Sequence, residues 1–296
     1  MTSEALRQHV SSALDREHLA RGALAHGPSG MHFLRFLKPT GQSASVYRPL
    51  LCLVLQGAKE VATSARTLLV ASGQSLIVSH ALPVVSRITK AEPEHPYVAL
   101  VFPINLDLMR GLMADLTPRP AAVRKDPFSI SLCDTDHEMA DALLRYLKQC
   151  DNEDARNLLA PITAREIHAR LLMGAHGEQL QRLLWLESTS SRISQATRQI
   201  HADLTRTITV ADLAHRVGMS SSAFFEHFKA VTGTSPLQYQ KDLRLLRARE
   251  ALLSTSEKVS EIAFGVGYES PAQFSREYAR KFGCPPRQDR MLSATE

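Results

Sequence analysis

The sequence predicts a two-domain α+β protein, with an N-terminal β-barrel or sandwich accompanied by helices and a C-terminal all-α domain. The chain of 296 residues is long enough for two separate hydrophobic cores. Short apolar runs of β type occur between His32 and Phe102, and runs of helical spacing follow them. Near the C-terminus, a pattern typical of a helix-turn-helix occurs twice, with a period of about 50 residues.

Residues 1–187 are expected to form the first domain. Residues 1–20 alternate polar and apolar side chains at helical spacing, which predicts a short helix. Glycine and proline residues separate the β-type runs that follow, and short strands at such spacing favour a barrel or a sandwich. The predicted strands are 51–55, 68–70, 76–78, 84–89 and 97–102.

Apolar residues at three- and four-residue steps predict helices in the segment of about 105–187. These helices present more apolar faces than one small barrel needs, so we expect the segment to form a homodimer contact. The alternative is that the same faces pack on the barrel. The residues that define the faces are Leu143, Leu144, Leu147, Leu158, Leu159, Ile162 and Ile167.

A Ser-rich stretch at 187–192 is the linker candidate, and residues 188–296 are the second domain. Each copy of the repeat has a small residue followed four residues later by a glycine, Ala214 with Gly218 and Ala263 with Gly267. The small residue lets two helices cross closely, and the glycine supplies the positive φ of the turn. The predicted helix-turn-helix units are 193–233 and 255–290.

A single helix, 235–254, is expected to join the two units. Ser235 and Pro236 form an N-cap and N1 pair, and Leu245, Ala248 and Leu252 continue an apolar stripe. About 20 residues at 1.5 Å each give a rod of about 30 Å, close to the roughly 34 Å of one turn of B-DNA. Two recognition helices on this rod can enter successive major grooves of double-stranded DNA. The alternative is an all-helical repeat module that binds protein.

Segments of both predicted domains resemble a known family. The stretch Ile262–Arg276, followed by Phe-Gly-Cys-Pro-Pro at 282–286, is similar to the DNA-binding domain of AraC/XylS-type transcriptional regulators, and the resemblance covers 192–290. Segment 20–175 resembles the N-terminal domain of one AraC subfamily, at Pro49–Gly57, Leu82–Val84 and Pro96–Leu100. The resemblance implies that the N-terminal domain is a cupin-like barrel.

The first two turns of each recognition helix are expected to contact DNA. The candidates in the first unit are Ser221, Ser222, Phe225, Glu226 and Lys229, and those in the second are Ala272, Gln273, Ser275, Arg276 and Arg280. The resemblance places base contacts at six of them: Ser222, Phe225, Glu226, Ala272, Gln273 and Arg276. Glu226 and Phe225 depart from the polar or basic residues that better-known members have there.

The chemistry of these side chains fits base edges. Glu226 can accept from cytosine N4, Phe225 can pack on a thymine methyl, Arg276 can bind guanine bidentately, and Gln273 can pair with adenine. Three alternatives stay open. Glu226 can pair with Lys229 within the helix, Arg276 can contact only phosphate, and Phe225 can belong to the core.

The N-terminal barrel is expected to bind a small-molecule effector, since small barrels either fill with side chains or enclose one ligand. Period-two alternation places Cys52, Val54 and Gln56 on one strand face, which mixes polar and apolar groups. Arg87 shares a face with Thr89 on another strand. The candidate effector-binding residues are Cys52, Gln56 and Arg87, and Cys52 is otherwise interpreted as a buried, inert thiol.

Charge and composition agree with this organisation. The formal net charge is +5, and residues 191–296 contain 15 Lys/Arg against 11 Asp/Glu. The basic excess therefore lies in the repeat segment, as contact with nucleic acid requires, although its size is modest.

Other chemistry is not indicated. None of the 4 cysteines lies in a C-x-x-C pair, and no His-x-His pair of a metal-binding cupin occurs; Glu92–His95 is the nearest cluster. Phosphate-binding and nucleophile motifs are absent from the sequence, so we expect no catalytic residues, no metal and no cofactor. The sequence has neither a secretory signal nor an apolar stretch of 18 residues, which predicts a cytoplasmic protein.

These observations favour a one-component transcriptional regulator of AraC type, either an activator or a repressor. Its expected partners are double-stranded DNA, a small effector and a second copy of the chain, with RNA polymerase as a further candidate. One alternative is a cupin-type enzyme with an appended DNA-binding module. Another is a DNA-repair protein with a sacrificial cysteine on a related two-unit fold.

Overall fold

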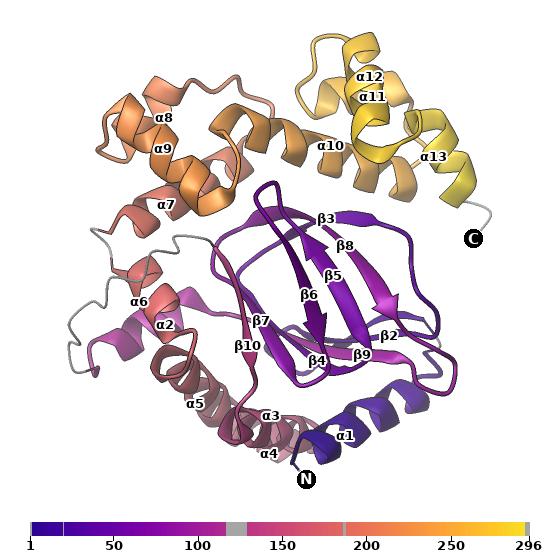
Figure 1. The fold of residues 1–296 in the computed structure, drawn as a ribbon, viewed down its shortest axis with the longest axis vertical. Helices are drawn as coiled ribbons and strands as arrows, with labels where there is room; N and C mark the ends of the chain where they lie inside the picture. Colours follow the sequence, from indigo (N-terminus) through magenta and orange to yellow (C-terminus); the bar gives the residue numbers. More distant parts are fainter. Residues whose placement is uncertain (1, 20, 117–128, 186–187, 294–296) are drawn as a thin grey trace.

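The computed structural model describes residues 2–19, 21–116, 129–185 and 188–293. It contains a sheet-rich N-terminal domain covered by helices and a helical C-terminal domain (Figure 1). The predicted fold class is thereby confirmed. Helix boundaries expected from the sequence agree with the observed helices to within a few residues, whereas several strands were not predicted.

Two antiparallel sheets form the N-terminal domain. The larger sheet has the order β1-β2-β9-β4-β7-β10 and the smaller has the order β3-β8-β5-β6. Between them lies an apolar cluster that includes Val54, Val61, Leu76, Val84 and Ala99. The strands are β1 (Gly22–His26), β2 (Met31–Phe36), β3 (Ser43–Tyr47), β4 (Leu50–Gln56), β5 (Ala58–Ala62), β6 (Thr67–Ala71), β7 (Gln74–Val78), β8 (Leu82–Lys90), β9 (Tyr97–Pro103) and β10 (Ile130–Asp134).

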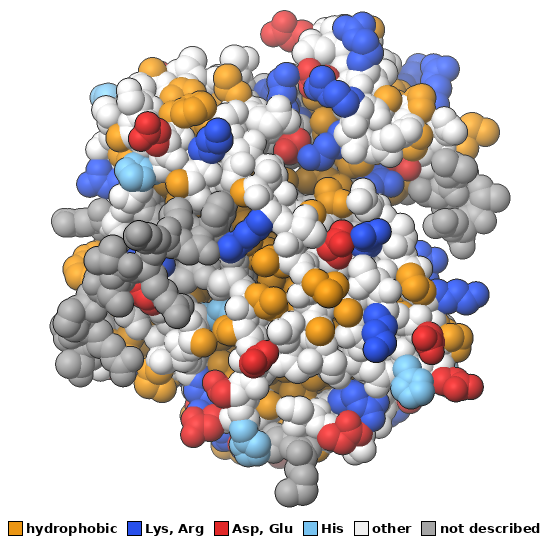
Figure 2. All heavy atoms as spheres, viewed as in Figure 1, with side chains coloured by type: hydrophobic (Ala, Val, Ile, Leu, Met, Phe, Trp, Pro, Cys, Tyr) orange, Lys and Arg blue, Asp and Glu red, His pale blue; other side chains and the backbone are white. Residues whose placement is uncertain are grey.

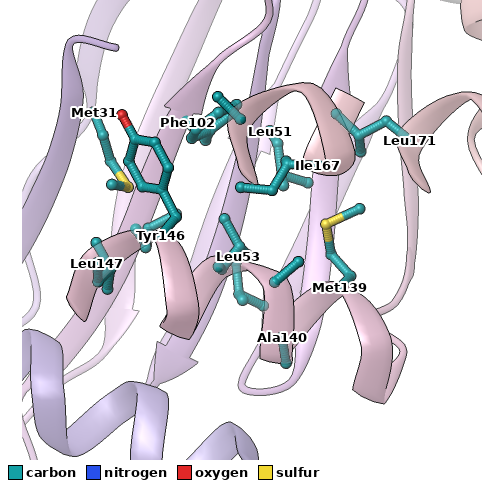
Figure 3. Close-up of a cluster of buried hydrophobic side chains, with 14 of the residues drawn as sticks. Met31, Leu51, Leu53, Phe102, Met139, Ala140, Tyr146, Leu147, Ile167 and Leu171 are labelled. Carbon is teal, nitrogen blue, oxygen red and sulfur yellow. The ribbon is translucent and has the colours of Figure 1, made fainter. Parts of the chain in front are cut away.

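Helices cover the outer face of the larger sheet. Figure 3 shows Leu51 and Phe102, from the sheet, facing Tyr146 and Ile167 from two of these helices. Each large apolar side chain buried in this way contributes roughly 1.5–3 kcal/mol. The helices are α1 (Thr2–Arg16), α2 (Leu106–Met113), α3 (His137–Cys150), α4 (Glu153–Leu158), α5 (Ala160–Met173) and α6 (Gly177–Leu184).

This packing separates the residues that were expected to form a dimer contact. Leu143, Leu147 and Ile167 are fully buried against the sheet. Leu158 and Ile162 remain exposed, at 71% and 66% of their surface. The alternative, packing on the barrel, therefore accounts for the first group but not for the second.

The Ser-rich stretch at 187–192 was expected to be a linker, and for most of its length this is wrong. Ser188 is the N-cap of α7 (Thr189–Ala202), and its side chain accepts a hydrogen bond from the Ser191 backbone N–H. Serines satisfy the free N–H groups of a first helical turn, so the same residues that suggest a break also start a helix. Glu187 lies outside the described residues.

Six further helices complete the C-terminal domain, and α10 runs between two groups of them (Figure 1). The helix predicted for 235–254 is observed as α10, which begins at Pro236 and ends at Ser254. The helices are α8 (Val210–Arg216), α9 (Ser221–Thr232), α10 (Pro236–Ser254), α11 (Val259–Gly265), α12 (Pro271–Phe282) and α13 (Pro286–Ser293).

The two domains meet through Val46 of β3, which packs on the apolar core of the first unit, and through polar contacts to backbone carbonyls. The Tyr239 hydroxyl of α10 donates to the Ala81 carbonyl over 2.6 Å, and the Ser129 hydroxyl donates to the Val231 carbonyl over 2.7 Å. The Nε2 atom of His80 lies 3.0 Å from the Ser190 carbonyl. Because a carbonyl can only accept, Nε2 carries the proton in this arrangement.

Burial at this junction sets the charge of His80. Desolvation lowers the pKa of His80 to about 4, although its hydrogen bond with the Ser190 carbonyl opposes this shift. Desolvation also lowers the pKa of His176, which lies next to Cys133 in the N-terminal domain, to about 4. Both imidazoles are therefore neutral in the folded protein at neutral pH.

We predict that the protein loses stability as the pH falls from about 6.5 to about 4. In this window the unfolded chain binds protons at both histidines and the folded chain does not, so each contributes a loss of up to about 1.4 kcal/mol per pH unit. Urea unfolding at a series of pH values measures the slope. His80→Gln should reduce it, whereas His32→Gln, at an exposed histidine, should not. An unchanged slope in His80→Gln would contradict this assignment.

Candidate nucleic-acid interface and effector cavity

The first helix-turn-helix unit is built from α8 and α9. Gly218 occupies the turn with φ of 66°, where a side chain would be strained. Ser220 caps α9 by accepting from the Ala223 backbone N–H. Phe224 and Phe228 are fully buried and contact each other, so the opposite face of α9 points outward.

That outward face carries all five residues predicted for the first unit. Phe225 is 41% exposed, so the alternative that it belongs to the core is wrong. Glu226 and Lys229 form no ion pair with each other or with other described residues. Their charges are therefore available to a partner. The exposed residues are Ser221, Ser222, Phe225, Glu226 and Lys229.

The second unit repeats this arrangement with α11 and α12. Ser270 caps α12, Pro271 is its first residue, and Phe274 and Tyr278 are fully buried. Ala272, Gln273, Arg276 and Arg280 are exposed, and Ser275 is partly exposed.

The predicted residues of α12 are not equally available. The Ser275 hydroxyl donates to the Pro271 carbonyl over 2.9 Å, and the Gln273 amide donates to Glu277 over 3.2 Å. A contact between Gln273 and a base would have to replace its hydrogen bond with Glu277. Arg276 and Arg280 have no ion pair within the described ranges, so their guanidinium groups are free to bind an external acceptor.

Partly buried ionic contacts join α12 and α13 to α10. Lys281 of α12 pairs with Asp242 over 2.9 Å, and Lys241 pairs with Glu277 over 3.0 Å. Asp289, at the start of α13, accepts from Arg249 over 2.8 Å.

Asp289 also connects α13 to α12, because it accepts from the Tyr278 hydroxyl over 2.6 Å. Sequence reasoning missed Asp242 and Asp289, which are 4% exposed each. Both are ordinary charged positions in the helical pattern, so nothing local distinguishes them from surface residues.

The surface charge is concentrated on one unit. Figure 2 shows Lys and Arg side chains gathered over the second unit, and fewer of them over the first. Arg276, Arg280 and Arg287 are exposed residues of the second unit. A surface of this charge attracts phosphate groups.

A cavity of about 570 Å³ opens between the two sheets and is closed on one side by α10. Its size lies within the range of small-molecule sites. The barrel supplies an apolar wall that includes Leu34, Phe36 and Ile88. Helix α10 contributes Leu246, Arg249, Glu250 and Leu253 to the opposite side.

Two polar side chains line this cavity from buried positions. Lys59 of β5 is 3% exposed, and its ammonium group donates to the Cys52 sulfur over 3.1 Å. Tyr97 of β9 is fully buried next to Phe36. Neither was a candidate from the sequence. The signal available there was that Lys59 shares a strand face with Val61 by period-two alternation, although a lysine is normally exposed.

The structure separates the three predicted effector-binding residues. Cys52 faces the space between the sheets. Gln56 does not share its face, so that expectation is wrong. A bulge between Val54 and Gln56 places Gln56 opposite Val98, whose side chain faces the helices, and Gln56 accepts from Arg7 of α1 over 3.0 Å. A bulge reverses the alternation on which the prediction depended.

Arg87 lies at the edge of the cavity rather than in its interior. Its guanidinium group forms two hydrogen bonds with the Glu60 carboxylate, at 3.1 and 3.0 Å. It shares β8 with Ile88, whose side chain points inward. Arg87 therefore brings positive charge to the opening of the cavity, and Glu60 offsets it.

Among the described residues, no group of three or more His, Cys, Asp or Glu side chains is arranged to hold a metal ion. None of the described helices is both long enough and apolar enough to cross a membrane.

Comparison with protein families identifies the class of protein. The model of the AraC-type transcriptional regulator N-terminus matches residues 28–179, about half of the chain. A helix-turn-helix domain model matches residues 213–291, which include α9 and α12. The chain therefore belongs to the AraC family of transcriptional regulators.

Individual relatives come from the same class. The transcriptional regulator ArgR of Pseudomonas aeruginosa is 30% identical over 150 residues, which are 51% of this chain and 45% of ArgR. The regulator ExsA of the same organism is 33% identical over 81 residues, 27% of this chain and 29% of ExsA. This chain thus spans less than half the length of these relatives.

A solved structure shares the fold of both domains. ToxT from Vibrio cholerae aligns with a TM-score of 0.58 at 11% identity, over 88% of this chain and 97% of ToxT. ToxT bound to an unsaturated fatty acid aligns with a TM-score of 0.55 at 10% identity, over 91% of this chain and 96% of ToxT. At such identity the likeness shows the fold alone.

Proposed function

We propose that this protein is a transcriptional regulator that binds duplex DNA through α9 and α12 and is controlled by a small effector in the cavity beside α10. The observation that carries the proposal is the pair of similar units at the two ends of one helix. Each unit presents charged side chains without an internal partner, Glu226 and Lys229 on α9 and Arg276 and Arg280 on α12.

The length of α10 supports binding in two successive major grooves. Its 19 residues extend about 28 Å, somewhat less than the roughly 34 Å of one helical turn of DNA. Recognition helices at its two ends can therefore reach one side of the duplex about one turn apart. The positive charge that would face the DNA phosphates comes from Lys229, Arg276 and Arg280. The side chains suited to contact base edges are Phe225, Glu226 and Gln273.

The cavity is connected to α12 through α10. Arg249 lines the cavity and also pairs with Asp289. Asp289 in turn accepts a hydrogen bond from the Tyr278 hydroxyl in α12. A ligand that displaces Arg249 or α10 would alter the support of the recognition helix. Such a ligand regulates only if it binds one arrangement of the domains more tightly than the other.

The comparisons favour a regulator over an enzyme. ArgR and ExsA are named as transcriptional regulators, and ToxT has been solved with a fatty acid bound. A bound small molecule in a protein of this fold supports an effector role for the cavity here. A cupin-type enzyme with a DNA-binding module would instead need a catalytic group in the cavity, and turnover of a substrate would support that alternative.

We predict that the full-length protein binds a selected duplex with strong salt dependence. Because the contacts include several phosphates, the affinity should fall by orders of magnitude between roughly 50 and 200 mM salt. A mobility-shift titration on a site selected from random sequences measures this. The absence of a shift, or a shift insensitive to salt, would contradict DNA binding by these units.

We further predict that Arg276→Ala costs about 1–3 kcal/mol of binding free energy and relaxes the sequence preference at one position of the site. Glu226→Ala should relax the preference about one helical turn away. Binding to a library of single-base variants measures both effects. Arg16→Ala, which removes an arginine of α1 that is 60% exposed, is the matched control and should change neither quantity. Equal weakening on all sequences would show that these residues contact phosphate or support the fold.

We propose that the protein dimerises through the exposed apolar surface formed by Leu158, Leu159 and Ile162 at the junction of α4 and α5. These side chains are 71%, 48% and 66% exposed. Three large exposed apolar groups within five residues of the chain are typical of a contact between proteins. Leu143 and Leu147 do not take part, because the sheet buries them.

Leu158→Glu combined with Ile162→Glu should weaken the dimer at least tenfold, about 1.4 kcal/mol, because two carboxylates would be buried in the contact. Sedimentation equilibrium of the full-length protein measures the dissociation constant. Leu69→Glu, at a β6 residue that is 59% exposed, is the control. A wild-type protein that stays monomeric at high micromolar concentration would rule out this contact.

A further inference from the structure

The cavity between the sheets and α10 contains a buried cation without a carboxylate partner. The Lys59 ammonium lies 3.1 Å from the Cys52 sulfur and 5.4 Å from the centre of the Tyr47 ring. Within the described part of the chain, Lys59 forms no salt bridge. Burial of an ammonium group without a counter-charge is costly, so proteins normally pair such a group.

The protonation of Lys59 depends on its neighbours. Burial acts to lower the pKa of Lys59, whereas Cys52, Tyr97 and Tyr47 raise it, and the net shift is upward. Because the Tyr97 hydroxyl is itself neutral, an anion bound beside the amine would supply the charge that holds Lys59 protonated in so buried a position. A sulfur atom and an aromatic ring stabilise it less than an oxyanion would.

A second polar group beside Lys59 also lacks a partner. The Tyr97 hydroxyl is fully buried and forms no hydrogen bond of standard geometry to any residue in the described ranges. Burial raises the pKa of Tyr97, so the hydroxyl is neutral and can donate. An unsatisfied buried donor costs roughly 1–3 kcal/mol, and native proteins rarely leave one without a use.

The lining of the cavity combines apolar surface with cationic groups. Leu34, Phe36 and Ile88 offer an apolar surface next to the two donors. Among the described residues that line the cavity, cationic groups outnumber carboxylates. The cationic residues are Arg21, Lys59, Arg87 and Arg249, and the carboxylate is Glu250.

We propose that the cavity binds a small organic carboxylate with an apolar body, whose oxygens accept hydrogen bonds from Lys59 and Tyr97. This deepens the proposed function, because it gives the chemical class of the effector. The carboxylate would provide the missing counter-charge, and the apolar body would lie against Leu34, Phe36 and Ile88. A neutral ligand of the same shape would leave the ammonium unpaired.

The site also explains why α10 would respond to the ligand. The apolar body would reach Leu246 and Leu253, which line the other side of the cavity. Leu253 is 46% exposed, so it has surface left for such a contact. The ligand would therefore contact both domains at once.

The test compares two probes, 2-naphthoate and its neutral counterpart 2-naphthamide, on the full-length protein by isothermal titration calorimetry. Naphthoate should bind at least tenfold more tightly than the amide, since only naphthoate pairs with the charge. Lys59→Met should weaken naphthoate by about 10–100-fold and leave the amide unchanged. Octanoate serves as a second carboxylate of different shape.

Tyr97→Phe keeps the ring and removes the hydroxyl, so the variant should fold even if Lys59→Met does not. It should weaken naphthoate about tenfold while leaving the melting temperature of the free protein unchanged or higher. Tyr146→Phe, which removes a hydroxyl bonded to Ser29 on the far face of the sheet, is the matched control. It should leave the naphthoate affinity unchanged and lower the melting temperature, because the lost hydroxyl was satisfied.

Three results would overturn the proposal. The first is equal affinity for naphthoate and naphthamide, and the second is naphthoate binding that survives both Lys59→Met and Tyr97→Phe. The third is failure of both carboxylates to bind the wild-type protein at millimolar concentration. By contrast, carboxylate binding that leaves DNA affinity unchanged would contradict effector control and leave the ligand class intact.

Discussion

The packing of α10 against three different surfaces is the constraint on which the rest of the structure depends. Tyr239 and Leu243 belong to the core of the first unit, and Leu245 and Leu252 belong to the core of the second. Leu246 faces the cavity of the N-terminal domain. Because one rigid helix supplies all three surfaces, the positions of the two recognition helices and of the barrel are fixed relative to one another. A change at any of these surfaces acts on the other two.

Most of the fold could be predicted from the sequence, because it follows from local patterns. The repeated small residue and glycine at Ala214–Gly218 and Ala263–Gly267 define the two turns, and Ser235 with Pro236 defines the start of α10. The strands that were not predicted depend on pairing between segments that are distant in the chain. Strand β10 follows a segment with no clear pattern and is held by β7, more than fifty residues earlier in the chain.

The cavity was less predictable than the exposed face of the recognition helices. Surface residues of a recognition helix follow directly from helical spacing, as Glu226 and Arg276 do. The interior of a sandwich depends on strict alternation, and the bulge after Val54 breaks it. Lys59 could not be predicted for a different reason. Burial of a lysine depends on the tertiary environment rather than on its neighbours in the sequence. Of the three predicted residues, Cys52 does face the space between the sheets, and the Lys59 ammonium lies 3.1 Å from its sulfur.

The contacts between the domains have a consequence for how easily they separate. Tyr239, Ser129 and His80 all bind backbone carbonyls of the other domain. Water can replace hydrogen bonds of this kind at little net cost in free energy. Exposing buried apolar surface to water costs much more. The polar part of this joint can therefore be exchanged for bonds to water at little cost, so separation of the domains depends mainly on apolar contacts such as that of Val46 with the first unit. Since the bonded carbonyls belong to the backbone, substitutions at Ala81, Val231 or Ser190 leave the acceptors in place, and the joint can persist while the surrounding sequence changes.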